Sequence, residues 1–324
     1  MNWQIQVPIP KYSFDISHSD VVFSAGSCFA QHMADRLAHY KFLCRNNPYG
    51  TLFHPIPLIY NLTNALNGSE IDEELFLQRE DASFHYSCHS SIWAESKEEL
   101  KSKLQTLQAS VAKNLKESKL LILTFGTAFL YKIADSEKVV ANCHKQLKKT
   151  FIRELSSPQQ IQAAFQSFYS ELKKQNPDIQ ILLSVSPVRH IRDGVHQNNL
   201  SKSALLLACE TIENSFDDVH YFPAYEIVID ELRDYRFFEK DKVHPNPEAR
   251  DYVWGKFSKA LLNQDTRLIN KDLDKLFSAL NHRPFREAST AHQSFLKKTL
   301  DLAIQLSEIV DLDQEIKVLK SGLK

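Results

Sequence analysis

The sequence predicts an α/β fold, a three-layer sandwich in which helices cover both faces of a mainly parallel sheet. Short, continuously apolar runs recur along the chain, and segments with helical spacing of apolar residues separate them. Continuous rather than alternating hydrophobicity is typical of strands that are buried on both faces. Strands that alternate with helices favour a parallel sheet, because each crossover needs a helix.

Four apolar runs are predicted strands: 21–25 (VVFSA), 119–125 (KLLILTF), 179–185 (IQILLSV) and 218–223 (DVHYFP). Directly after the first run, apolar residues recur at helical spacing from 29 to 38. Further helices are predicted over 96–117, 158–175, 199–214 and 247–262. The ligand site of such a fold lies at the carboxyl ends of the strands. The sequence places GSC, GTA and SPVRH there.

Residues from about 264 onward differ from the rest, since they are rich in Leu, Lys and Asp and contain no strand-like run. We therefore expect a hydrolase-like domain over 1–263 and a C-terminal helical extension over 264–324. Leu and Ile recur in a heptad-like pattern between 295 and 319, which would suit a partner helix. A helix that packs on its own domain is the favoured interpretation.

The composition bounds the class of partner. The 324 residues are 43% hydrophobic and 24% charged, with a net charge of −1, so no charge excess points to nucleic acid or an anionic membrane. The five cysteines include no CxxC pair, which argues against a disulfide framework. The N-terminus lacks the features of a secretion signal, and no apolar run approaches the ~18 residues of a membrane span. We expect a cytoplasmic protein, and the oligomeric state stays open.

The turn after the first predicted strand, Gly26-Ser27-Cys28, is the first candidate for chemistry. A nucleophile there would gain from the N–H groups and the positive end of the following helix. Gly26 would let the chain turn sharply. The alternative is structural: Ser27 caps the helix and Cys28 is buried.

The second candidate is the stretch DKVHPNPEA, in which Asp241 and His244 precede a helix start marked by proline. This spacing lets one loop present both side chains, with the carboxylate orienting the imidazole. His244 can then act as a general base. An Asp-x-x-His pair alone is a weak signal, and it gains weight only beside the first turn.

Together these two motifs have the layout of the SGNH, or GDSL-like, hydrolases, which the sequence resembles. GSCFA at 26–30 is the signature of the GSCFA family, a branch of that superfamily. The other segments similar to that family lie at 47–55, 124–131, 141–145, 184–190, 221–237 and 241–254. The resemblance spans residues from about 20 to 257, and it implies an SGNH-type, flavodoxin-like sandwich.

The resemblance implies a hydrolase that acts on a small acyl ester through a covalent acyl-enzyme, with a carbohydrate acetyl ester as the first candidate. An ungapped match to Gly-Asp-Ser-Leu puts the superfamily's serine on Cys28 and its aspartate on Ser27. Cys28 is the favoured nucleophile, and Ser27 remains the alternative. His244 would take its proton and Asp241 would support His244. No cofactor and no metal are implied.

The resemblance also implies an oxyanion hole, formed by the backbone N–H of the nucleophile, a loop glycine and an asparagine. Gly50 in NPYG matches the glycine. The third block, normally Gly-x-Asn, reads Gly126-Thr127-Ala128 and lacks the asparagine. Asn142 in ANCHK is our hypothesis for its replacement. His89 is expected to line the cleft.

Three alternatives stay open. The altered blocks would suit a catalytically silent SGNH-fold binding module, and an acyltransferase would use the same residues as a hydrolase. A zinc site from His85, Cys88 and His89 with Cys143-His144 is not favoured, because no pair has a recognised finger spacing.

Overall fold

A computed structural model describes residues 4–285 and 289–323. Within them the central sheet has five strands, all paired in parallel, in the order β10-β9-β5-β1-β2. The strands are β1 (Val21–Gly26), β2 (Leu43–Asn46), β5 (Leu120–Phe125), β9 (Gln180–Val185) and β10 (Val219–Tyr221). The predicted α/β sandwich with a parallel sheet is confirmed, and so are the four predicted strands.

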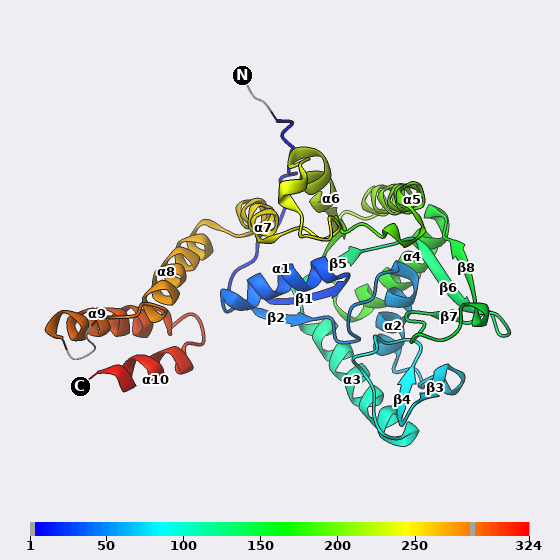
Figure 1. The fold of residues 1–324 in the computed structure, drawn as a ribbon, viewed down its shortest axis with the longest axis horizontal. Coiled ribbons are helices and arrows are strands. Elements are labelled where there is room, and N and C mark those ends of the chain that lie inside the picture. The colour runs from blue at the N-terminus through cyan, green and yellow to red at the C-terminus, as the bar shows by residue number, and fades with distance from the viewer. Residues whose placement is uncertain (1–3, 286–288, 324) are drawn as a thin grey trace.

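Helices cover both faces of this sheet (Figure 1). One core joins Phe23 and Ala25 of β1 to the helices α2 (Pro55–Asn67), α3 (Lys97–Glu117), α4 (Pro158–Gln175) and α5 (Val195–Glu213). The other core joins Val22 to α1 (Cys28–His39) and α7 (Pro247–Leu261). Because alternate side chains of one strand enter different cores, both must be apolar. This is the physical reason for the continuous runs.

Local signals set several helix starts. Ser157 caps α4 in a capping box with Gln160, and Asn246 caps α7 by accepting the N–H of Ala249. Proline occupies the first turn of α2, α4 and α7, where no N–H is needed. These caps explain why the predicted helices 158–175 and 247–262 agree with the structure within a residue or two.

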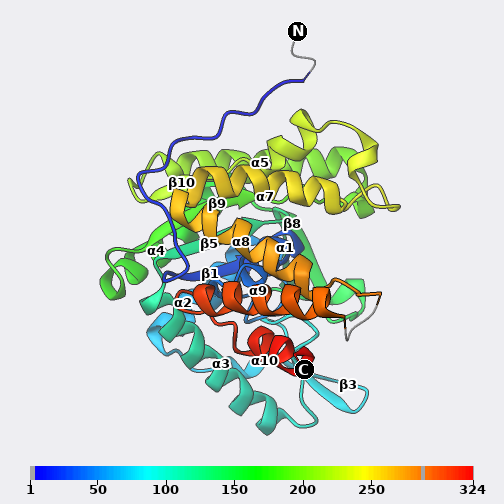
Figure 2. The same ribbon diagram turned by 90° about the vertical axis from the view of Figure 1, so that its left-hand side faces the viewer.

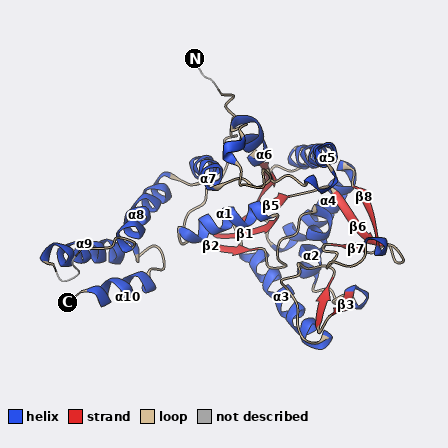
Figure 3. Cartoon of the chain, viewed as in Figure 1, coloured by secondary structure: helices blue, strands red, loops and turns tan. Residues whose placement is uncertain are grey.

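Two elements beside the site, β2 and α2, were not predicted from the sequence. β2 is an edge strand with alternating half-exposed and exposed side chains, so it carries no apolar run. α2 begins at the cap His54 and ends at Gly68 in the left-handed conformation, both of which are recognisable signals. Two small antiparallel sheets also lie apart from the central one (Figure 3): β3 (Phe76–Arg79) with β4 (Ala82–His85), and β6 (Phe129–Ile133) with β7 (Val139–Val140) and β8 (Phe151–Leu155).

A short segment links β10 to α7. It contains α6 (Ala224–Glu226) and one turn of π-helix over Ile227–Glu231. The loop from Asp234 to Asn246 follows and carries Asp241 and His244. Asn246 donates its backbone N–H to Phe237 O at 2.9 Å, which closes this loop on itself. The Asp-His pair is therefore presented by a compact loop directly before α7.

The C-terminal region consists of α8 (Gln264–Leu280), α9 (Thr290–Leu306) and α10 (Asp313–Gly322). Figure 1 shows these helices as an arm beside α1 and β2, and Figure 2 shows them stacked in front of the sheet. Side chains of all three, including Leu273, Leu306 and Leu319, join the core that contains α1. α9 ends at Leu306 and α10 starts at Asp313, so the heptad-like pattern is interrupted, and these helices pack on their own chain. In the described chain no helix is both long and apolar enough to cross a membrane.

The strand order places the site. The chain winds from β1 to β2 on one side and then from β5 to β10 on the other, so the order reverses between β1 and β5. In doubly wound folds the ligand crevice lies at the carboxyl ends of the strands at this switch point. Gly26 ends β1, and Gly126 directly follows β5. Two of the expected motifs therefore lie side by side.

Candidate active site

The turn between β1 and α1 requires its glycine. Gly26 has φ of +135°, and a Cβ there would lie 2.1 Å from the carbonyl oxygen of Thr124 on β5. The next residue, Ser27, donates its N–H to that same oxygen at 2.9 Å. Gly26 also donates to Asn47 Oδ1 at 2.8 Å and accepts from the N–H of Leu52 at 3.0 Å. The turn is thus fixed against both β5 and the loop that carries NPYG.

Ser27 and Cys28 have different surroundings on this turn. Ser27 is buried, with 1% of its surface exposed, and its Oγ caps α1 by accepting the N–H of Phe29 at 3.3 Å. Cys28 is the first residue of α1 and is half-buried. Burial raises the pKa of its thiol, whereas its own N–H, the charge of Lys202 and the N–H of Phe29 lower that pKa. Burial outweighs the other contributions, so the pKa of Cys28 stays above its usual value, and the helix N-terminus and Lys202 limit the rise.

Asp241 and His244 form a hydrogen-bonded pair. Asp241 Oδ2 lies 2.7 Å from His244 Nδ1, and Oδ1 accepts the backbone N–H groups of Val243 and His244 at 2.9 and 3.0 Å. These hydrogen bonds lower the pKa of Asp241 to about 2, so it is a carboxylate at neutral pH. A carboxylate only accepts, so Nδ1 carries the proton and Nε2 of a neutral His244 is the basic nitrogen.

The structure brings this pair to the N-terminal half of α1. His244 interacts electrostatically with His32, which lies one turn beyond Cys28, and with His190 in the loop that follows β9. Arg250 of α7 bonds to His32 Nε2 at 3.1 Å and so ties the helix after His244 to α1. No hydrogen bond joins His244 to Ser27 or Cys28 among the described residues. Catalytic hydrogen bonds often tighten only when substrate binds.

Two further residues belong to this cluster. Lys202 on α5 is 1% exposed, and its Nζ donates to Gly126 O at 2.6 Å and Ser186 O at 2.7 Å. Burial lowers its pKa to about 7. His190 has a buried Nε2 with no hydrogen-bond partner in the described structure, and burial lowers its pKa to about 4. Its ring meets that of Phe53 edge-on at 5.3 Å.

The sequence contains a signal for Lys202 in the spacing of the residues around it. Positions 202, 205, 209 and 212 are all buried and lie at helical spacing on one face of α5. A lysine on an apolar helix face is rarely left unpaired in a core. It is therefore a candidate for a functional role.

The glycines expected in the oxyanion hole donate to neighbouring carbonyls. Gly50 donates its N–H to Asn47 O at 2.8 Å, and Gly126 donates to Phe53 O at 2.7 Å. Gly50 also has φ of +73°, and a Cβ there would lie 2.3 Å from Cβ of His89. Both glycines hold the loops of the site together, and His89 packs directly on Gly50.

His89 lies against Gly50 of the NPYG loop, and Asn142 lies on the loop that follows β7. His89 is half-buried, and its Nδ1 pairs with Ser91 Oγ at 3.0 Å. Asn142 Oδ1 accepts the N–H of His144 at 2.8 Å, which leaves its amide nitrogen without a protein partner in the described structure. Asn142 lines a cavity of about 650 Å³. Its other lining residues include Phe53, Tyr131, Phe151, Cys143, Lys145, Lys148, Arg153, Arg192 and Asp193, and neither Cys28 nor His244 is among them.

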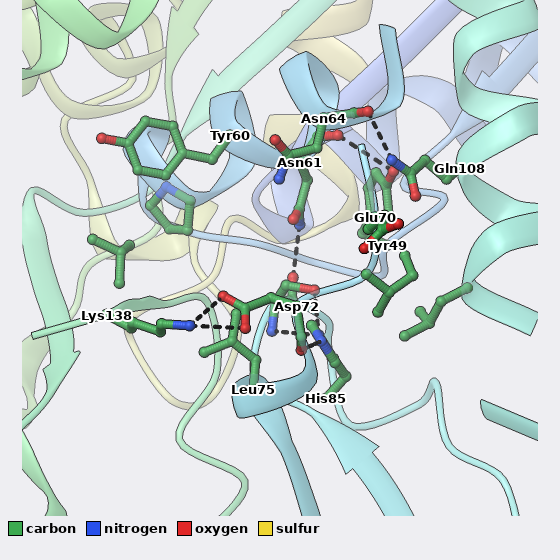
Figure 4. A pocket seen from close by; sticks show the side chains of 15 residues that line it. Tyr49, Tyr60, Asn61, Asn64, Glu70, Asp72, Leu75, His85, Gln108 and Lys138 are labelled. Carbon is green, nitrogen blue, oxygen red and sulfur yellow. Dashed lines mark hydrogen bonds and ion pairs between the residues drawn. The ribbon is translucent and has the colours of Figure 1, made fainter. Parts of the chain in front are cut away.

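A smaller cavity of about 220 Å³ lies beside α2 and α3 (Figure 4). Its polar groups bond to one another: Lys138 pairs with Asp72 at 2.7 Å, and His85 Nε2 meets Asp72 O at 3.1 Å. Tyr49 joins this cavity to the NPYG loop, since its hydroxyl donates to Asn61 O. The cavity contains neither Cys28 nor His244, so we assign it to the support of that loop.

The side chains of the zinc alternative are engaged elsewhere. His144 Nε2 lies 3.0 Å from His85 O, and Cys88 is fully buried. Across residues 4–285 and 289–323, no three His, Cys, Asp or Glu side chains are grouped so that they could hold a metal ion.

The fold and the cluster at its switch point define a doubly wound α/β protein with a candidate active site after β1. The GSCFA family model matches residues 21–257, and the chain belongs to this family. A second family model, described as GSCFA domain protein, C-terminal domain, matches residues 273–324. The resemblance seen in the sequence is thereby confirmed at the level of the family.

One solved structure similar to the chain is an acetyl xylan esterase (Est2A) from the rumen bacterium Butyrivibrio proteoclasticus. The two share 12% sequence identity with a TM-score of 0.34, over 81% of this chain and 65% of that chain. The chain thus spans slightly less than two thirds of the esterase's length. No curated protein matches the chain.

Proposed function

We propose that the protein is an acyl-ester hydrolase of the SGNH type in which Cys28 is the nucleophile. The observation that carries this proposal is the position of Cys28 at the N-terminus of α1, at the switch point of the sheet, with the Asp241–His244 pair brought to the same helix. The burial of Ser27 favours Cys28, because only 1% of the Ser27 surface is exposed and its Oγ lies against the N–H of Phe29.

In the proposed reaction, His244 Nε2 takes the proton of the Cys28 thiol, and the sulfur attacks the ester carbonyl carbon. The carbonyl oxygen becomes an oxyanion. When the C–O bond breaks, the imidazolium gives its proton to the leaving alcohol and a thioester remains. A water molecule, deprotonated by His244, then hydrolyses the thioester and restores the thiol. Asp241 accepts from Nδ1 throughout and stabilises the imidazolium.

The oxyanion needs donors that the protein does not already use. The N–H of Cys28 lies in the first turn of α1, where helix geometry offers no backbone acceptor. The amide nitrogen of Asn142 is the side-chain donor we propose, in place of the asparagine missing from Gly126-Thr127-Ala128. Gly50 and Gly126 then act by holding the loops, and a shift of either loop would release their N–H groups to the oxyanion.

For the substrate we propose a small acyl ester of a polar alcohol, with a carbohydrate acetyl ester as the first candidate. The cavity that Asn142 lines supports this choice: it contains neither Cys28 nor His244, but it adjoins the cluster through Phe53, whose ring meets that of His190. Its rings of Tyr131 and Phe151 and its polar side chains suit a hydroxyl-rich group. Transfer to an acceptor alcohol in place of water would use the same residues.

Covalent labelling tests the proposal. The protein is incubated with p-nitrophenyl acetate, quenched in acid, and mapped by mass spectrometry. We expect an acetyl group on Cys28, release of p-nitrophenol, and loss of both in Cys28→Ala. The matched control is Cys44→Ala on β2, which also removes a half-buried thiol and should leave both unchanged.

Other outcomes would redirect the interpretation. An acetyl group on Ser27 would establish the serine version, and transfer of acetyl to added xylose or glycerol in preference to water would establish an acyltransferase. No adduct and no turnover, with p-nitrophenyl acetate or with an acetylated oligosaccharide, would contradict an esterase and support a binding module.

A further inference from the structure

Lys202 is a buried cation that the proposed mechanism does not use. It lies on α5 with 1% of its surface exposed, on the same helix face as Leu205 and Cys209. Lysine is almost never buried this completely unless an opposite charge accompanies it. The side chain therefore needs an explanation beyond packing.

The contacts of Lys202 hold its ammonium in place but do not neutralise it. Nζ donates to Gly126 O at 2.6 Å and to Ser186 O at 2.7 Å. Its third neighbour is the ring of Tyr225, whose centroid lies 6.0 Å away. Across the described residues no Asp or Glu oxygen lies within ion-pair distance of Nζ. Two backbone carbonyls could be satisfied equally well by a neutral donor, so the charge itself is in excess of what the fold requires.

The two carbonyls show where this charge lies. Gly126 and Ser186 directly follow β5 and β9, which are neighbours in the sheet. β1 is the next strand after β5, and its last residue, Gly26, pairs with Thr124. Lys202 is therefore held at the carboxyl ends of the central strands, at the same level as the turn that carries Cys28.

Cys28 and Lys202 affect each other electrostatically. Among the described groups, Cys28 is the one whose negative charge raises the pKa of Lys202, against the larger lowering by burial. In return, the charge of Lys202 lowers the pKa of the Cys28 thiol, which burial raises. Each group thus makes the charged form of the other less costly.

We propose that Lys202 is the electrostatic partner of Cys28, a positioning residue whose ammonium stabilises negative charge on the sulfur at the moment of attack. The inference rests on the proposed function and adds to it. The thiol proton still passes to His244, and no bond to Lys202 forms or breaks. The charge leaves the sulfur when the carbon–sulfur bond forms, so Lys202 favours the thiolate over the thiol without entering the reaction.

Thiol alkylation tests this without any ester. The full chain is treated with iodoacetamide from about pH 6 to about pH 10.5, and the rate at each cysteine is read by mass spectrometry. In Lys202→Gln, which keeps an N–H donor but no charge, we expect the rate at Cys28 to fall about tenfold near pH 6, where Lys202 with its pKa of about 7 is protonated, for an acidity change of about one pKa unit. The rate should approach the wild-type value at high pH, where the sulfur ionises unaided. Cys143 in the same molecule is the internal reference.

A purely structural role for Lys202 would give another pattern. The rate at Cys28 would then be unchanged, or would change by one factor at every pH, and either result overturns the proposal. Lys202→Arg, which keeps the charge, should retain most of the wild-type rate near pH 6, where Lys202 is protonated. Circular dichroism shows whether each variant is folded.

A second measurement leaves Lys202 intact, in case the neutral variant does not fold. Cys28→Asp and Cys28→Asn place a charged and a neutral side chain of equal size at the start of α1, where both are well tolerated. With lysines labelled with ¹³C at Cε, we expect Lys202 to titrate about one pH unit higher in the Asp variant. Equal midpoints would refute the pairing. If alkylation depends on Lys202 but no ester turns over, the pair stands and the esterase proposal fails.

Discussion

His54 should make the unfolding free energy of the protein fall at acidic pH. It is 6% exposed and caps α2, with Nδ1 accepting the N–H of Ile56 at 3.0 Å and Nε2 lying 3.1 Å from Ser156 Oγ. Since Nδ1 accepts, the ring is neutral and Nε2 carries the proton. Protonation of Nδ1 would place its N–H against the N–H of Ile56, and the capping hydrogen bond would be lost. Burial lowers the pKa of His54 to about 3.

The sign and the size of the effect follow from linkage. In the unfolded chain His54 is protonated below about pH 6.5, whereas in the folded chain it stays neutral down to about pH 3. The stabilisation is therefore complete above about pH 6.5 and is lost as the pH falls. Across the whole interval the unfolding free energy falls by roughly 5 kcal/mol, and between about pH 7 and about pH 4.5 it falls by roughly 2.5 kcal/mol.

Urea unfolding of the wild type and of His54→Asn at several pH values measures this. Asparagine keeps an N-cap acceptor but does not titrate. At neutral pH we expect the variant to be the less stable of the two, because the smaller side chain leaves a gap. The difference in unfolding free energy should shrink by about 2.5 kcal/mol between about pH 7 and about pH 4.5. If the two stability curves run parallel across this interval, the reasoning is refuted.

Three further outcomes are expected. Gly26→Ala should lower the free energy of unfolding by about 3 kcal/mol or more, because its Cβ would meet Thr124 O in a strained backbone; an unchanged melting temperature would contradict this. Ser27→Ala should cost about 1 kcal/mol through the lost cap yet keep ester turnover, and a folded but inactive variant would point to Ser27 as the nucleophile. Asp241→Asn should lower kcat by about 10³-fold or more while leaving the fold intact, since the amide no longer fixes the His244 tautomer; near-normal kcat would remove Asp241 from the mechanism.

Much of the fold could be predicted because its signals are local. The four predicted strands are buried on both faces, so their consecutive residues are apolar and the strands can be recognised from short segments. The glycine turn and the start of α7 are also local, since Gly26 and Pro247 act within a few residues. β2 escaped prediction because an edge strand has no such run. α2 could have been found from Pro55 and Gly68.

The candidate site was only partly accessible to sequence reasoning. Asp241 and His244 are three residues apart, so the sequence by itself predicts that one loop presents both. The turn at Gly26 was expected from the sequence. The hydrogen bonds that the N–H groups of Gly50 and Gly126 donate were not, because they depend on which carbonyls the neighbouring loops bring close.

By itself, the sequence determined the parallel α/β class, the GSCFA family and the motifs that end β1 and precede α7. Only the tertiary structure decided that Ser27 is a buried cap while the charge of Lys202 acts on Cys28. The carbonyls that hold Lys202 lie 76 and 16 residues away from it. Hydrophobic periodicity records whether a residue is buried, because burial depends on its own helix or strand. The partner that it meets there depends on the order of strands in the sheet, which no short stretch of sequence contains.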